Sequence, residues 1–78
     1  MKEEILNCLN DKKNGGNYKQ LLAFCKEPKE YKEIEKGKIK GDLFKNIVAL
    51  QRAQGLAFAS GKYFATPLAL EVLQSIFP

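Results

Sequence analysis

The apolar residues change their spacing twice in the second half of the chain, and this pattern restricts the fold more than any other feature. Between residues 42 and 54, Leu43, Ile47 and Leu50 recur at spacings of four and three, which predicts a long amphipathic helix. Residues 56–59 and 62–65 then alternate with a period of two on either side of Ser60-Gly61, which predicts a β-hairpin. We therefore expect a mainly α fold with a small β-hairpin.

A last helix is expected over residues 67–77. Thr66 is a suitable N-cap and Pro67 suits the first helical position, where a missing N–H has no consequence. Apolar residues cover nearly the whole circumference of this helix. In so small a domain such a helix cannot bury every side on its own core, so we expect it to pack on the core or on a partner.

The first half of the chain predicts three shorter helices. Residues 2–13 form the first, ended by Asn14-Gly15-Gly16, and residues 17–26 form the second, ended by Glu27-Pro28. A third is expected over 29–36, closed by Gly37. For the long helix, Asp42 is the expected N-cap and Gly55 the residue that closes its last turn.

The side-chain inventory argues for a binding module and against an enzyme. The chain has 78 residues, enough for one domain over 1–78, and it holds no His and only two cysteines. It cannot supply the four ligands of a structural zinc site, the disulfide framework of a small secreted domain or a His general base. Cys8 and Cys25 lie at apolar positions and are interpreted as reduced core thiols. No catalytic residue, metal or cofactor is therefore predicted.

The net charge of +4 is concentrated in one segment. Residues 1–35 contain seven lysines and seven acids, and residues 53–78 contain only Lys62 and Glu71. The excess lies in residues 36–52, where five basic residues face a single acid: Lys36, Lys38, Lys40, Lys45 and Arg52 against Asp42. A localised basic segment favours a polyanionic partner, although a solvated helix end is an equal alternative for lysines alone.

From Leu43 onward the sequence LFKNIVALQRAQGLAFASGKYFATPLALEVL resembles winged-helix DNA-binding domains, especially the MarR-like and PadR-like regulators. The similarity rests on the run from Leu50 to Leu56, a hairpin with Gly61 at its tip, the Thr66-Pro67 helix start and the Val72-Leu73 pair. It implies a winged helix-turn-helix with a recognition helix over about 42–54 and a wing over about 56–66. Either residues 17–26 or residues 29–36 are the first helix of the motif; we prefer 29–36, with Gly37-Lys38-Ile39 as the turn.

The resemblance implies that the long helix lies in the major groove while the hairpin tip follows the adjacent backbone. Lys38, Lys40, Lys45 and Lys62 are then candidates for phosphate contacts, and Arg52 for the backbone or a carboxylate. If they point outward, Asn46 and Gln51 suit adenine edges. Gly41 would allow the backbone a close approach to DNA, or is simply the turn before the helix. Phe44 is expected to flank the core.

These expectations define two functions to compare. The first is sequence-specific binding of double-stranded DNA by a small, repressor-like transcriptional regulator that dimerises through its last helix. The alternative for that helix is that residues 2–13 cover it within the monomer. The second function is a winged helix that binds protein as an assembly module. No apolar run approaches the ~20 residues of a membrane span, and no apolar stretch of a secretion signal follows Met1, so a cytoplasmic protein is expected.

Overall fold

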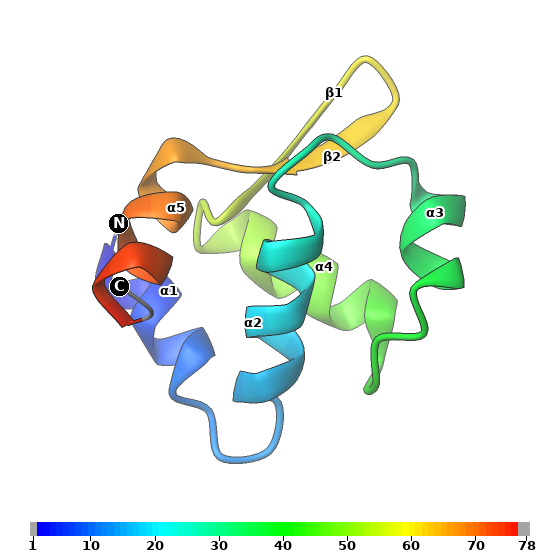
Figure 1. Ribbon diagram of the computed structural model, residues 1–78. Helices are drawn as coiled ribbons and strands as arrows, with labels where there is room; N and C mark the ends of the chain where they lie inside the picture. Colours follow the sequence, from blue (N-terminus) through cyan, green and yellow to red (C-terminus); the bar gives the residue numbers. More distant parts are fainter. Residues whose placement is uncertain (1, 77–78) are drawn as a thin grey trace.

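The computed structural model describes residues 2–76 as a mainly helical structure with one two-stranded antiparallel hairpin (Figure 1). The coarse fold class expected from the sequence is therefore confirmed. The elements in chain order are α1 (Lys2–Leu9), α2 (Gly15–Phe24), α3 (Tyr31–Lys36), α4 (Leu43–Arg52), β1 (Leu56–Ala59), β2 (Lys62–Ala65) and α5 (Pro67–Ile76).

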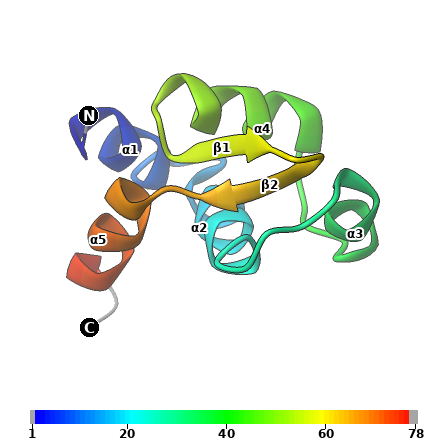
Figure 2. The same ribbon diagram turned by 90° about the horizontal axis from the view of Figure 1, so that it is seen from above.

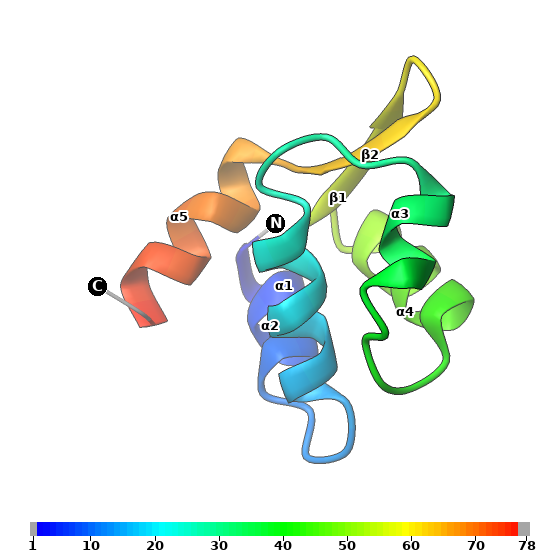
Figure 3. The same ribbon diagram turned by 45° about the vertical axis from the view of Figure 1, so that its right-hand side comes forward.

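A single apolar core joins these elements. α1 packs against α2 and α5, while α2 packs against α4, and α4 against β1. In Figures 1 and 2, α1 and α5 form one end of the molecule and α3 forms the other. Figure 3 shows α2 crossing in front of α1. The fully buried large side chains come from the first four helices and the residue that follows α2: Ile5, Leu9, Leu21, Leu22, Cys25, Ile34, Ile47 and Leu50.

The hairpin forms at the residues that the alternation predicts. Leu56 pairs with Ala65, and Phe58 pairs with Tyr63. Ser60 and Gly61 have φ of 53° and 75°, so both turn residues are left-handed, as a type I′ turn requires. Figure 2 shows the two strands running alongside α4, and in Figure 1 their tip projects beyond the helices.

Lys29, in the segment between α2 and α3, forms an isolated antiparallel bridge with Tyr63 of the hairpin. The Lys29 N–H donates to the Tyr63 carbonyl (2.8 Å), and the Tyr63 N–H donates to the Lys29 carbonyl (2.7 Å). The Ala65 N–H also donates to the carbonyl of Cys25 (2.8 Å). These bonds fix β2 to the end of α2 and to the segment that follows it. The alternation of apolar residues could not predict the bridge at Lys29, because a single residue shows no period.

Side-chain caps start three of the helices. The Lys45 N–H donates to Asp42 Oδ1 (3.1 Å), which confirms Asp42 as the N-cap of α4. The Ala69 N–H donates to the Thr66 hydroxyl (3.2 Å), and that hydroxyl donates to the carbonyl of Gln54 (2.7 Å). Thr66 therefore caps α5 and ties its start to the end of α4. At α3, the Glu30 N–H donates to the side chain of Glu33 (3.0 Å).

The first two helices differ from the expected boundaries. α1 ends at Leu9 rather than at residue 13. The Asp11 carboxylate accepts hydrogen bonds from the N–H groups of Lys13 (3.2 Å) and Asn14 (2.6 Å), and this Asx-type turn redirects the chain. Asn14 is the N-cap of α2, so the Gly15-Gly16 pair begins a helix instead of ending one.

The left-handed residues after α3 and α4 also differ from the expected ones. Gly37 has an ordinary helical φ of −70°, and the left-handed residue is Lys38, with φ of 53°. After α4 the left-handed residue is Gln54, with φ of 65°, rather than Gly55. Each helix therefore closes with a non-glycine residue in a conformation that disfavours L side chains.

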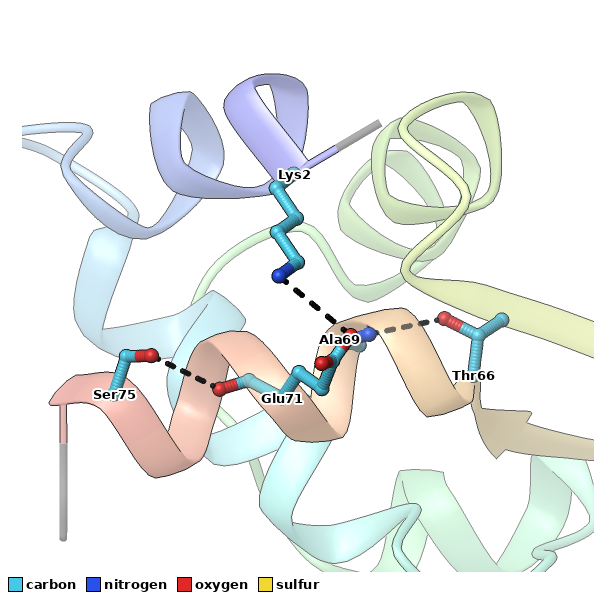
Figure 4. Close-up of polar contacts among 5 residues, drawn as sticks. All are labelled: Lys2, Thr66, Ala69, Glu71 and Ser75. Carbon is cyan, nitrogen blue, oxygen red and sulfur yellow. Dashed lines mark hydrogen bonds and ion pairs between the residues drawn. The ribbon is translucent and has the colours of Figure 1, made fainter.

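The last helix packs on the core of its own chain. Ala69, Val72 and Leu73 are buried, and α1 and α2 both contact α5. Lys2 Nζ lies 3.7 Å from Glu71 Oε2, an exposed ion pair between α1 and α5 (Figure 4). The alternative in which the first helix covers α5 is thus partly realised. Residue 77 of the expected 67–77 helix lies outside the described residues.

Candidate nucleic-acid interface

α4 has an inward face and an outward face that are set by its helical period. Side chains three and four residues apart share a face, so Leu43, Ile47 and Leu50 turn together toward the core. On the opposite side of the helix, five side chains form what we call the outward face: Phe44, Lys45, Val48, Ala49 and Arg52. These five side chains, with Tyr18 of α2, line a shallow surface depression. Burial raises the pKa of the Tyr18 hydroxyl, with smaller effects from Cys8 and Asp11.

Asn46 does not offer its amide to a partner, contrary to the expectation that it points outward. Its side chain is buried, with an exposed fraction of 4%. Position 46 lies three residues after Leu43 and four before Leu50, and so it shares their inward face. Gln51 follows Leu50 and is half-buried at the edge of α4.

Gly41 belongs to the turn before α4, which favours the second interpretation given above for this residue. Its φ is +91°, a conformation that side chains rarely adopt. A Cβ at this position would lie 2.7 Å from Asn17 Nδ2 and 3.1 Å from Asn46 Nδ2. Asn17 in turn donates to Asn14 Oδ1 (3.3 Å). The close approach that Gly41 permits is therefore to asparagine side chains of the same chain.

The turn between α3 and α4 brings two of the expected phosphate contacts together. Lys38 and Lys40 line a polar depression with Gly16, Asn17 and Gln20 of α2. Both lysines are exposed, while Ile39 between them packs against the core. The alternation of exposed Lys and half-buried Ile therefore holds two cations at one corner of the molecule.

Lys62 lies apart from the other basic residues, at the tip of the hairpin. Figures 1 and 3 show the hairpin tip above α3 and the turn before α4 below it. Phe58 on β1 is 54% exposed, and its ring centroid lies 4.7 Å from that of Tyr63. Tyr63 also approaches Tyr31 of α3, at 6.3 Å between centroids.

The basic residues of this region have no acidic partners in the described part of the chain. Lys36, Lys38, Lys40, Lys45, Arg52 and Lys62 are all exposed, and none forms an ion pair within residues 2–76. The single carboxylate of residues 36–52, Asp42, accepts a hydrogen bond as the N-cap of α4. The positive charge of the segment therefore remains available to an anion.

The two cysteines are poor candidates for chemistry. Cys25 is buried in the core, and burial raises its thiol pKa to about 11, although Lys29 acts in the opposite direction. Burial also raises the pKa of the half-buried Cys8 thiol, with further contributions from Asp11 and Glu4. Both thiols stay protonated at neutral pH, as expected of reduced core cysteines.

A second surface groove lies between α2 and α5, away from the basic turn. It encloses about 430 Å³. Its apolar lining consists of Ala23, Pro67, Leu70 and Leu73, and its polar rim of Lys19, Lys26, Glu71 and Gln74. Part of the apolar surface of α5 therefore faces this groove, whose other wall in α2 the sequence analysis did not predict.

Sequence reasoning also missed the most exposed apolar residue of α4. Phe44 was expected beside the core, but its side chain is 63% exposed. Its position one residue after Leu43 and three before Ile47 left both orientations open. The available signal was its spacing of four from Val48, which places both side chains on the outward face.

Comparisons with known proteins add no family to this description. No protein-family model, curated protein or solved structure matches the chain. Among residues 2–76, no helix has the length and apolar character needed to cross a bilayer.

Proposed function

We propose that the chain is a winged helix-turn-helix domain that binds double-stranded DNA sequence-specifically, as a small repressor-like transcriptional regulator. In this proposal α3 is the first helix of the motif, α4 is the recognition helix and the β1–β2 hairpin is the wing. Support comes from the order of the elements and from Ile39, which anchors the intervening turn on the core. The Lys29–Tyr63 bridge adds support, because it joins the start of α3 to the wing.

The observation that carries the proposal is the unpaired basic charge around α4. Lys38 and Lys40 precede the helix, whereas Lys45 and Arg52 lie on its outward face, and none has an acidic partner within residues 2–76. DNA presents a dense row of phosphates that such side chains neutralise with release of counterions. Lys62 at the hairpin tip would extend the contact to a neighbouring part of the backbone.

A duplex-DNA titration at two salt concentrations tests this function. With about five phosphates neutralised per chain, affinity should fall by roughly two to three orders of magnitude between ~50 and ~200 mM salt. Lys40→Glu and Lys45→Glu should each weaken binding by about tenfold or more at the lower salt. Lys12→Glu carries the same charge change on an exposed residue outside the region and serves as the matched control. Equal affinity of all four proteins at both salt concentrations would rule out the proposal.

The proposed regulator acts as a homodimer through the groove between α2 and α5. A single chain offers few phosphate contacts, and two chains bound to a palindromic site would double them. The groove supplies the apolar surface, with Leu70 and Leu73 on one wall and Ala23 on the other. Because dimers of this kind bury the same patch of both chains, a charge placed in the groove acts twice.

Sedimentation at high micromolar concentration tests the dimer. Ala23 is exposed in the described structure, so Ala23→Glu should leave the fold intact while it places two carboxylates in the interface. We expect a dimer for the wild type and for Ala59→Glu, an exposed alanine on the hairpin, and a monomer for Ala23→Glu. A monomeric wild-type protein would remove the dimer from the proposal and leave the DNA contact to be judged separately.

A second candidate function is protein binding by the same face of α4. It is favoured by the large exposed aromatic side chain of Phe44 on this face, and a second exposed aromatic side chain, Phe58, lies on the hairpin. Salt distinguishes the two functions. Binding to a protein through these rings would persist when salt is raised, whereas binding to DNA would weaken steeply.

A further inference from the structure

The outward face of α4 presents apolar groups at the positions where a recognition helix contacts bases. Phe44 is 63% exposed, and Val48 follows it one helical turn later on the same face. The amide that could have read base edges, Asn46, is buried. One side of the face is therefore an apolar strip, built from a ring and a branched aliphatic chain rather than from an amide.

Stability of the fold does not account for Phe44. A phenyl ring that remains mostly in water contributes little of the free energy that its burial would provide. Lys45 and Arg52 lie beside it in the same depression, and residues 43–52 contain no acid. The face therefore combines an apolar strip with two cations on one side of it, and a matching occupant supplies anions beside an apolar group.

The major groove of DNA contains one apolar group of this kind, the C5-methyl of thymine. The remaining groups on its base edges are donors and acceptors, and a phenyl ring placed over them would remove water without giving a hydrogen bond in return. Phosphates line the edges of the groove, which places anions within reach of cations that lie beside the apolar strip.

We infer that Phe44 and Val48 read thymine methyl groups in the major groove, while Lys45 and Arg52 hold the flanking phosphates. This inference rests on the proposed DNA-binding function and names its specificity. It makes Phe44 a specificity-determining residue, because its ring would contact the base edge directly.

Two pairs of synthetic duplexes isolate the methyl group. Alternating dA-dT and dA-dU polymers differ only by loss of the C5-methyl, and alternating dG-dC and dG-5-methyl-dC polymers differ only by its gain. For the wild-type chain, measured by fluorescence anisotropy at low salt, we expect about fivefold to tenfold weaker binding to dA-dU than to dA-dT. We expect tighter binding to the methylated dG-dC polymer than to the unmodified one, by a similar factor.

Variants of the two exposed aromatic residues assign the effect to α4. Phe44→Ala should lose most of the preference within each pair and keep only the part that Val48 provides, and Phe44→Leu should retain more of it. Phe58→Ala removes a ring of comparable exposure from the hairpin and should keep the full preference. Circular dichroism of each variant confirms that its helical content matches that of the wild type.

The outcomes separate this inference from the function beneath it. Wild-type binding that weakens with salt but ignores the methyl group would overturn the thymine inference and leave DNA binding standing. A methyl preference that survives undiminished in Phe44→Ala would overturn the role of Phe44. Absence of binding to all four polymers at low salt would overturn the proposed function and the inference together.

Discussion

The inward and outward faces of α4 differ sharply in burial and in charge. The inward face is closed, with Ile47 and Leu50 at 1% and 0% exposure and a buried asparagine between them and the turn. The outward face holds a largely exposed phenyl ring and two unpaired cations. One ten-residue helix thus secures the fold with one stripe and offers a surface with the other. Substitutions at neighbouring positions of this helix should therefore have different effects. A change on the inward face should lower stability, whereas a change on the outward face should alter binding.

Substitution of the inward face should have the largest effect on stability. Ile47→Ala removes buried methyl and methylene groups and leaves a cavity, so we expect unfolding free energy to fall by about 2–5 kcal/mol. Val48→Ala, one residue away on the outward face, should cost less than about 1 kcal/mol. Urea unfolding of both variants measures the difference. Similar losses for the two would contradict the assignment of faces.

The pH dependence of stability tests how well the core that the inward face of α4 joins excludes water. The Cys25 thiol has a folded pKa of about 11 against an ordinary value of 9.0, so between these values the unfolded chain loses its proton first. Stability is therefore complete below pH 9 and should fall by about 2–3 kcal/mol as pH rises to 11. Other groups titrate there too, so the measured quantity is the difference from Cys25→Ala. Parallel pH profiles for the two proteins would show a hydrated thiol.

Substitution of Gly41 tests how the turn before α4 is held against the rest of the chain. Gly41→Ala forces a side chain into the left-handed region and against the amides of Asn17 and Asn46. We expect a loss of about 1–2 kcal/mol in unfolding free energy. If instead Gly41 serves mainly to let DNA approach, the alanine variant would unfold like the wild type and lose only DNA affinity.

The smallest change in stability is expected for Lys38→Gly, which should raise the free energy of unfolding and lower the affinity for DNA. Lys38 is left-handed and exposed, so Lys38→Gly should stabilise the fold by about 0.5–1 kcal/mol while it weakens DNA binding by removing a phosphate contact. Gln54→Gly is the matched control, because Gln54 has the same backbone conformation after α4. It should stabilise the chain by a similar amount and leave DNA affinity unchanged. Equal DNA affinities of the two variants would remove Lys38 from the interface.

The second half of the fold follows from local sequence signals. The β1–β2 hairpin, the Asp42 cap and the helix start at Thr66-Pro67 lie where alternation and capping chemistry predict them. The caps depend on residues three positions apart and the hairpin pairs residues no more than nine apart, so a short stretch of sequence carries each signal. The single-residue bridge of Lys29 depends on the distant Tyr63 and left no local pattern.

The errors in the candidate interface have similarly local causes. Gly15-Gly16 was interpreted as a helix end because glycine is common there, but the Asp11 side chain turns the chain earlier. Asn46 was interpreted by its chemistry rather than by its spacing, which places it inward with Leu50. Phe44 was expected beside the core because of its apolar character, although its helical phase matches Val48 on the outward face. Residue type alone misled in each case.

Amide chemical-shift mapping with a duplex titrated into the ¹⁵N-labelled chain tests the central claim most directly. We predict that the largest changes occur over residues 38–48 and 60–62, around the start of α4 and the hairpin tip. The chemical shifts of the α5 amides should change little on addition of duplex, because the proposed dimer contact at α5 already exists in the free protein. Changes confined to α1 and α5, or none on addition of duplex at low salt, would contradict the assignment of the outward face of α4 to DNA.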